Sequence, residues 1–137
     1  SSNNINVCGH LGLQPQLVVD SSGYKIQGKD DIGAQKILDD ALLLESLGVS
    51  VIVLECIPRE LAKNVSQSLR IPTIGIGAGS ACDGQVLVSY DMLGITSGRL
   101  PRFARNFMVG KGSVRLAIES FNEEVKAGTY PSIDETY

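Results

Sequence analysis

Short, nearly unbroken apolar runs alternate along this chain with longer stretches whose apolar residues recur at helical spacing. Four such runs lie near residues 5–9, 49–54, 73–76 and 85–88. A run of this length without polar residues is typical of a strand buried on both faces, and such strands occur mostly in parallel sheets. Strands that alternate with helices along a chain are joined by right-handed crossovers in a parallel sheet. The alternation therefore predicts an α/β fold.

Helical spacing predicts two helices between the strands and two more after the last strand. Their expected bounds are 33–47, 59–69, 101–109 and 113–126. In the first of them, Ile37, Ala41, Leu44 and Leu47 recur at intervals of three or four residues and should face the sheet. The chain has 137 residues, so we expect a single domain over residues 1–137.

The composition is that of a globular protein without a strongly charged or membrane partner. Apolar residues make up 43% of the chain and the net charge is −3, which gives no reason to expect nucleic acid or an acidic membrane surface as a partner. No apolar run approaches the roughly 20 residues that a membrane-spanning helix needs. The three cysteines, Cys8, Cys56 and Cys82, lack the spacing of a disulfide framework, so we expect reduced thiols and a cytoplasmic location.

Glu55 is the first candidate for chemistry, because it ends an apolar run that begins at Val51. The carboxyl ends of parallel strands share one edge of the sheet, where α/β folds place their active sites. His10 ends the first run, and Gly77 and Gly79 follow the third, so all should lie at the same edge as Glu55. They would supply a candidate base, a hydrogen-bonding or acidic group, and a loop whose backbone N–H groups can approach a ligand.

Each of these residues also has a purely structural interpretation. Glu55 could cap the loop after its strand or pair with a nearby lysine or arginine, and a single histidine such as His10 is often a structural residue. The GIGAG sequence around Gly77 and Gly79 also fits simple tight turning, and it lacks the Lys-Ser/Thr of a phosphate-binding loop. The catalytic hypothesis therefore depends on the convergence of all of them at one edge.

The cysteines near these residues allow two other interpretations. Cys8 and His10 are two residues apart on one expected strand and so face the same side. Together with Glu55 they could form a metal site, although the usual ligand spacings are absent. Cys56 could be a nucleophile, but strand alternation turns it to the face opposite Glu55, so we interpret it as a packing residue.

Two further features lie outside the expected strands and helices. Asp83 and Asp91 come after the third and fourth strands, and we interpret them as solvated or turn-capping carboxylates. The connection from Gly12 to Lys29 is long for a link between a strand and its crossover helix, which indicates a functional segment such as a lid. Residues 23–28 within it could form a short strand or flap.

Several motifs occur in one order across most of the chain. They are VCGHLGLQPQ at 7–16, GYKIQG at 23–28, VLECIP at 53–58, IPTIGIGAG at 71–79 and CDGQVLV at 82–88. In this order they resemble the ketopantoate hydroxymethyltransferase family, and the resemblance continues through PRFARNF at 101–107 and GTYP at 128–131. Gln14 is a departure, since the family usually has threonine there.

The resemblance implies an enzyme with a parallel (β/α)8 barrel of the phosphoenolpyruvate/pyruvate type. It implies transfer of a hydroxymethyl group from 5,10-methylenetetrahydrofolate to the small 2-oxo acid 3-methyl-2-oxobutanoate, giving 2-dehydropantoate in pantothenate biosynthesis. In the family, the residue that matches Glu55 is the proton acceptor, and the residue that matches His10 lies at the substrate end of its strand. The resemblance also implies magnesium, Mg2+, as cofactor and a homo-oligomeric assembly.

Only half of that barrel is expected in this chain. The four expected strands correspond to its C-terminal half, followed by the C-terminal helices. The family's magnesium-binding aspartates and substrate-binding lysine lie in the N-terminal half, so we assign no metal ligand to this chain. The missing half could belong to a longer enzyme of which this chain is one part, which we favour, to a separate segment, or to a second copy of a native half-barrel.

Two other functions stay open at this point. A half-barrel without its metal-binding half could be a catalytically incomplete structural or interaction module. Another enolate-forming enzyme of the same barrel type, such as a lyase acting on a small 2-oxo acid, would use a similar base but no folate. Dependence on folate would therefore separate such a lyase from a hydroxymethyltransferase.

Overall fold

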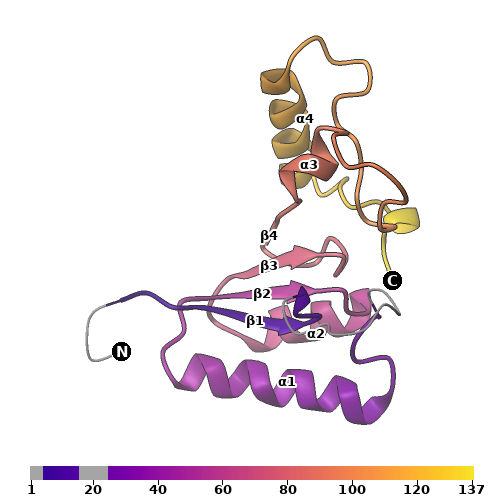
Figure 1. The fold of residues 1–137 in the computed structure, drawn as a ribbon. Coiled ribbons are helices and arrows are strands. Elements are labelled where there is room, and N and C mark those ends of the chain that lie inside the picture. The colour runs from indigo at the N-terminus through magenta and orange to yellow at the C-terminus, as the bar shows by residue number, and fades with distance from the viewer. Residues whose placement is uncertain (1–4, 16–24) are drawn as a thin grey trace.

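The computed structural model describes residues 5–15 and 25–137 and contains a four-stranded parallel sheet (Figure 1). The strands, in spatial order, are β1 (Cys8–Gly12), β2 (Val51–Glu55), β3 (Thr73–Ile76) and β4 (Gly84–Gln85). All neighbouring strands run parallel, so the predicted α/β fold class is confirmed. The predicted lid over residues 12–29 and the flap at 23–28 lie partly outside the described residues.

The register of the sheet places Glu55 between two neighbouring strands. Gly12 of β1 is its direct neighbour on one side, and Ile76 of β3 is its neighbour on the other. The strand expected over residues 5–9 extends to Gly12, because its ladder with β2 continues to that residue. His10 therefore lies two residues before the end of β1, paired with Val53, and does not end the strand as predicted.

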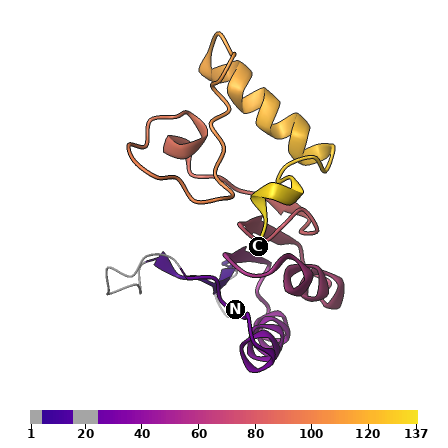
Figure 2. The same ribbon diagram turned by 90° about the vertical axis from the view of Figure 1, so that its right-hand side faces the viewer.

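One face of the sheet is covered by two helices, which lie side by side against it (Figures 1 and 2). These are α1 (Asp31–Ser46) and α2 (Arg59–Ser68). The Asp30 side chain accepts a hydrogen bond from the Gly33 N–H at 2.8 Å, which caps the start of α1. Because α1 ends at Ser46, Leu47 follows the helix and is 67% exposed, contrary to the predicted buried face.

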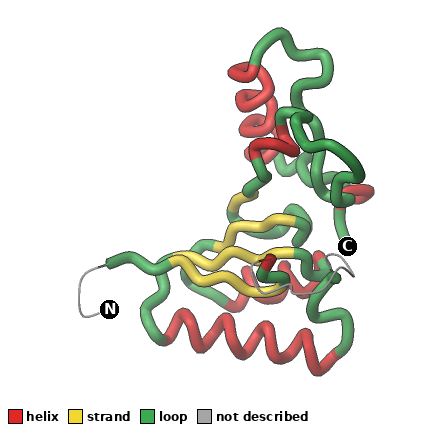
Figure 3. The backbone as a smooth tube through the Cα atoms, viewed as in Figure 1, coloured by secondary structure: helices red, strands yellow, loops and turns green. Residues whose placement is uncertain are grey.

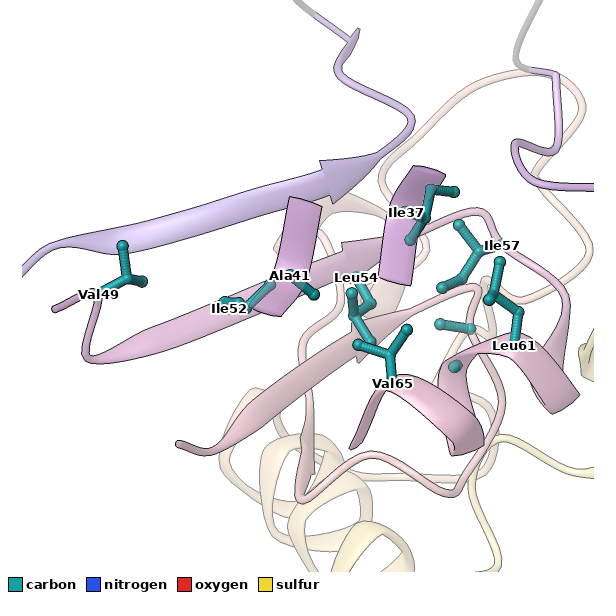
Figure 4. Packing of buried hydrophobic residues seen from close by; sticks show 10 residues of the cluster. Ile37, Ala41, Val49, Ile52, Leu54, Ile57, Leu61 and Val65 are labelled. Atoms are coloured by element: carbon teal, nitrogen blue, oxygen red, sulfur yellow. The ribbon is translucent and has the colours of Figure 1, made fainter. Parts of the chain in front are cut away.

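Aliphatic side chains fill the space between the sheet and these helices (Figure 4). Ile52 and Leu54 of β2 are fully buried there, and alternate residues of the strand point to the other face. The other buried members are Ile37, Ala41, Val49, Ile57, Leu61, Ala62, Val65 and Ala78. This group, the helix-side core, leaves Val53 and Glu55 on the opposite face of β2.

The chain after β4 forms a C-terminal segment, residues 89–137, that rises from the sheet on the side away from α1 and α2 (Figures 1 and 3). It contains α3 (Ser89–Met92), α4 (Val114–Lys126) and the short 3-10 helix η2 (Ile133–Glu135). The strand expected over 85–88 is shorter in the structure, because the Val88 carbonyl accepts hydrogen bonds from Asp91 and Met92 and so begins α3.

The helix predicted near residues 101–109 is wrong, since turns and irregular chain occupy these positions. A helix would need a hydrogen bond from the Phe107 N–H to the Phe103 carbonyl, four residues earlier. Instead, the Phe107 N–H donates to the Met92 carbonyl at 2.7 Å, and the Tyr130 hydroxyl donates to the Phe103 carbonyl at 2.6 Å. Hydrogen bonds between distant parts of the chain thus replace the helical ones.

A second buried cluster joins the C-terminal segment to the sheet. Its buried members are Leu13, Cys56, Ile76, Leu87, Met92, Phe103, Phe107, Ala117 and Tyr130. The Phe107 ring meets the rings of Tyr130 and Phe121 edge to face, with centroids 5.3 and 5.4 Å apart. We call this group the lobe-side core, because the C-terminal segment forms a lobe on this side of the sheet. It packs against the face of the sheet that the two helices leave uncovered.

Both outer strands of the sheet present an open edge within the described part of the chain. β1 pairs only with β2 there, and β4 pairs only with β3. Sheet edges are normally paired or covered in a stable protein, which is consistent with a sheet that is part of a larger barrel. Across the same described residues, no helix combines the length and apolar character needed to cross a membrane.

Candidate functional site

His10 and Glu55 meet on the face of the sheet opposite α1 and α2. Because alternate residues of a strand share a face, His10 of β1 lies on the same face as Val53 and Glu55 of β2. His10 Nε2 and a Glu55 carboxylate oxygen are 2.9 Å apart, which is a hydrogen-bond distance. Gly12, directly opposite Glu55, has no side chain that could come between them. The structure thus brings these two residues together as the sequence predicts, and their chemical roles stay predictions.

The surroundings of Glu55 suit a proton acceptor. The Glu55 side chain is 12% exposed and that of His10 is 32% exposed, so the pair is shielded and still reachable from solvent. Burial raises the pKa of the Glu55 carboxyl above its ordinary value of 4.5, while the charge and the hydrogen bond of His10 oppose the rise. A higher pKa makes the carboxylate a stronger base, which favours removal of a proton from carbon.

Hydrogen bonds to the backbone of both residues hold the pair in place. The Leu13 N–H donates to the Glu55 carbonyl at 2.8 Å, and the N–H of the next residue, Cys56, donates to a carbonyl of β3 at 2.9 Å. On the other strand, the Gln14 side-chain amide donates to the His10 carbonyl at 3.0 Å. Sequence reasoning missed this role of Gln14, because no local pattern marks a side chain that turns back to its own strand.

Gly77 and Gly79 have positive φ angles of 64° and 79° and are both buried. A Cβ atom on Gly77 would lie 2.5 Å from a ring carbon of Phe103, and one on Gly79 would lie 2.7 Å from the Cβ of Arg59. The close approach of neighbouring protein atoms therefore explains both glycines. Their use as a backbone loop that binds a ligand stays a prediction.

Cys56 does not point where strand alternation predicts. Its φ angle is +49°, and its side chain belongs to the lobe-side core, whereas alternation would place it in the helix-side core. The expectation about its face is wrong because this left-handed backbone interrupts the strand pattern directly after Glu55. Burial, followed by the nearby charge of Glu55, raises the pKa of the Cys56 thiol to about 12. A thiol that ionises so reluctantly is a poor nucleophile, as expected of a packing residue.

Asp83 and Asp91 have structural partners. The Asp83 carboxylate accepts hydrogen bonds from the backbone N–H and the hydroxyl of Thr73 at 2.8 and 3.0 Å, and so holds the start of β3. The Asp91 carboxylate accepts one from the Thr96 hydroxyl at 2.6 Å, within the turn after α3. The Asp91 contact agrees with the turn-capping interpretation, although Asp91 is buried and not solvated, whereas Asp83 binds a residue ten positions earlier in the chain and so does not cap a local turn.

The described residues contain no group of three or more histidine, cysteine or acidic side chains arranged to hold a metal ion. The site considered for Cys8, His10 and Glu55 is therefore not formed. The Cys8 thiol donates to the backbone carbonyl of Gly9 and lies outside the His10–Glu55 contact. A magnesium ion takes about six oxygen ligands, so this pair does not make a magnesium site by itself.

Comparison with known proteins gives concordant matches along the chain. A family model described as ketopantoate hydroxymethyltransferase matches residues 1–133. A protein named 3-methyl-2-oxobutanoate hydroxymethyltransferase from Ruthia magnifica subsp. Calyptogena magnifica is 58% identical over 99% of this chain and 52% of its own length. Proteins of the same name from Erwinia tasmaniensis and Shewanella denitrificans are 54% and 53% identical over 93% and 96% of this chain, and over 48% and 50% of their own lengths. The chain thus spans about half the length of the curated relatives it matches.

Proposed function

This chain belongs to the ketopantoate hydroxymethyltransferase family, and on that premise we propose that it forms the part of a hydroxymethyltransferase that carries the catalytic base. The proposed reaction adds a hydroxymethyl group to 3-methyl-2-oxobutanoate, with 5,10-methylenetetrahydrofolate as the donor. The observation that carries the proposal is the 2.9 Å contact between Glu55 and His10 at the carboxyl edge of the sheet.

In the proposed mechanism, Glu55 removes the proton from C3 of the 2-oxo acid. The electron pair of the broken C–H bond forms the enolate, and C3 then bonds to the methylene carbon of the donor. Both C–N bonds of that carbon break, water supplies the hydroxyl group, and the two nitrogens of the released tetrahydrofolate take up the proton from C3 and the remaining proton of the water. Burial of Glu55 raises its pKa and strengthens it for this step. His10 holds the carboxylate by the hydrogen bond from Nε2 and lies beside the place where the substrate would bind.

The rest of the site would come from outside the described residues. Magnesium needs about six oxygen ligands, and the described residues offer only the Glu55 carboxylate at this site, which is already hydrogen-bonded to His10. The described residues therefore do not form a magnesium site. We propose that magnesium, the substrate carboxylate and the folate are held by an N-terminal half joined to the open edges of this sheet. A homo-oligomeric assembly and a cytoplasmic location stay predictions.

Replacement of the base tests the proposal. In the complete protein that carries this chain, Glu55→Gln should slow exchange of the C3 proton of 3-methyl-2-oxobutanoate with D2O by about 10²–10⁴-fold, the usual contribution of a positioned base. Glu60→Gln, an exposed change at the start of α2, is the matched control and should exchange at the wild-type rate. Exchange at the wild-type rate in Glu55→Gln would exclude Glu55 as the base.

A second candidate is a catalytically incomplete module that binds another protein, because the described residues hold no group of side chains arranged to bind a metal ion. On this alternative, titration of the isolated chain with 3-methyl-2-oxobutanoate and magnesium should release no heat, and the complete protein should also lack activity. Magnesium-dependent binding by the isolated chain would argue against the alternative. Exchange of the C3 proton without net folate-dependent product would indicate a related enolate-forming enzyme.

A further inference from the structure

The backbone directly after Glu55 adopts a conformation that amino acids with a side chain rarely adopt. Cys56, with a φ angle of +49°, is the one non-glycine residue with positive φ among residues 5–15 and 25–137. Such a conformation is sterically disfavoured and persists only where the surrounding structure enforces it. It therefore needs a structural reason at this position.

The contacts of Cys56 provide that reason. Its N–H donates to the Ile76 carbonyl, and its own carbonyl accepts from the Gln27 N–H, both at 2.9 Å. Its side chain is buried in the lobe-side core, and the next residue, Ile57, returns to the helix-side core. The turn at Cys56 is thus fixed at its backbone and at its side chain.

The carbonyl of the peptide unit that joins Glu55 to Cys56 is equally confined. The Leu13 N–H donates to the Glu55 carbonyl at 2.8 Å. A Cβ atom on Gly12 would lie 2.1 Å from that same carbonyl oxygen, which is far inside van der Waals contact. Only glycine therefore fits at this point of β1. The one peptide unit that joins Glu55 to Cys56 is therefore held from two sides, by Leu13 directly after β1 and by Ile76 of β3, and the left-handed turn follows it directly.

We propose that Cys56 is a positioning residue, whose left-handed backbone sets the direction from which the Glu55 carboxylate reaches Nε2 of His10. The backbone conformation performs this role, and the thiol serves only to fill the lobe-side core. The catalytic consequence of this inference rests on the proposed function of Glu55 as the base. The geometric claim itself concerns only the contact between Glu55 and His10.

Three substitutions separate the backbone from the side chain. Cys56→Gly keeps the left-handed conformation and removes the packing group, whereas Cys56→Val keeps an apolar group of similar size and disfavours positive φ. Cys56→Ala removes the thiol as Cys56→Gly does and differs from it only by the Cβ atom. Comparison of Cys56→Ala with Cys56→Gly is the internal control, and it can be made even if Cys56→Val does not fold.

The direct measurement is the 15N NMR spectrum of the imidazole ring of His10, the single histidine of this 137-residue chain. Cys56→Gly should keep the wild-type Nε2 shift, and Cys56→Val should move it toward the value found in Glu55→Gln. Cys56→Ala should lie between them, with a melting temperature no higher than that of Cys56→Gly. A wild-type signal in Cys56→Val, or a lost contact in Cys56→Gly, would overturn the proposal in favour of a packing role.

Kinetics in the complete protein give a second readout. Cys56→Val should lower kcat for C3 proton exchange on the order of 10²-fold, the effect of a misplaced reacting group, with little change in KM for the 2-oxo acid. Cys56→Gly should keep kcat within about threefold of the wild type at temperatures below its melting transition. If the wild type itself shows no exchange, the proposed function fails, while the NMR comparison still decides the role of Cys56.

Discussion

The sheet with its two helices and the C-terminal segment are held together by different kinds of contact. In the first region, aliphatic side chains such as Ile52 and Leu54 are fully buried between β2 and the helices. In the C-terminal segment, Arg105 makes ion pairs with Glu124 and Glu135, and its guanidinium carbon lies 5.1 Å from the centroid of the Tyr130 ring. Burial of aliphatic side chains stabilises one region, whereas in the other the lobe-side core is supplemented by directional pairing of a few charged side chains.

This difference bears on the candidate site, because Glu55 lies where the two regions meet. Glu55 ends a strand of the helix-side core, and the adjacent Cys56 belongs to the lobe-side core. Loss of either core should therefore disturb the position of Glu55, the proposed base, but by different routes and under different conditions.

The largest effect on stability is expected in the helix-side core. Leu54→Ala should lower the free energy of unfolding by about 2–5 kcal/mol, because it removes buried methyl groups and leaves a cavity. Urea unfolding followed by circular dichroism measures the change. Leu43→Ala, at an exposed position of α1, is the matched control and should change stability by less than about 0.5 kcal/mol. Equal losses in the two variants would contradict the assigned core.

A smaller effect, confined to the C-terminal segment, is expected from Arg105→Ala. Glu135 binds Arg105 through two hydrogen bonds of 2.6 Å, so the change leaves two carboxylates without their partner. We expect a loss of about 1–2 kcal/mol, since the groups are only partly buried. Hydrogen exchange should accelerate in α4 and remain unchanged in β2.

Arg115→Ala is the control for that change. Arg115 pairs with Glu119 on the exposed surface of α4, where an ion pair contributes about 0.3–0.5 kcal/mol. Exchange should therefore stay near the wild-type rate throughout α4. Equal acceleration in β2 and α4 of the Arg105 variant would show that the two regions unfold as one unit.

The smallest effect is a pH dependence of opposite sign in the two regions. Burial works to raise the pKa of Glu135, but hydrogen bonds from Arg105 and Ser132 outweigh it and lower the pKa below 4.5. Its stabilising contribution is present above pH 4.5 and is lost as the pH falls through the lowered value. The pKa of Glu55 is raised, so its carboxyl opposes folding increasingly as the pH rises above 4.5.

Melting temperatures across the pH range test this contrast. Glu135→Gln should reduce the loss of stability below pH 4.5, and Glu55→Gln should raise the melting temperature at neutral pH. Such a destabilising carboxylate would be consistent with the proposed role of Glu55, because functional residues often lower stability. A lower melting temperature at neutral pH in Glu55→Gln would indicate that Glu55 stabilises the fold instead.

Periodic patterns were sufficient to predict the sheet and its two covering helices, because each apolar face there repeats along a regular element. The same patterns failed at residues 101–109, where Phe107 hydrogen-bonds to Met92 and Tyr130 binds the Phe103 carbonyl. Those partners are distant in sequence, so no local pattern contains them. The C-terminal segment is therefore the less predictable of the two regions.

The site shows the same division between regular and irregular structure. Convergence of His10 and Glu55 followed from their places on parallel strands, and the 2.9 Å contact agrees with it. The direction of the Cys56 side chain did not follow, because alternation holds only while the backbone stays extended. The nearby side chains of Phe103 and Arg59, which no local pattern reveals, explain the small size of Gly77 and Gly79, and the use of these glycines as a ligand-binding loop stays a prediction.

The close approach of β1 to the Glu55 peptide has an evolutionary consequence. Every change of a glycine codon to that of another residue adds a Cβ atom, and at Gly12 that atom would collide with the Glu55 carbonyl oxygen 2.1 Å away. No single substitution at Gly12 is therefore expected to be accommodated unless β1 or β2 moves. A position with no functional group of its own is thus expected to tolerate substitution poorly, because the geometry around the proposed base depends on it.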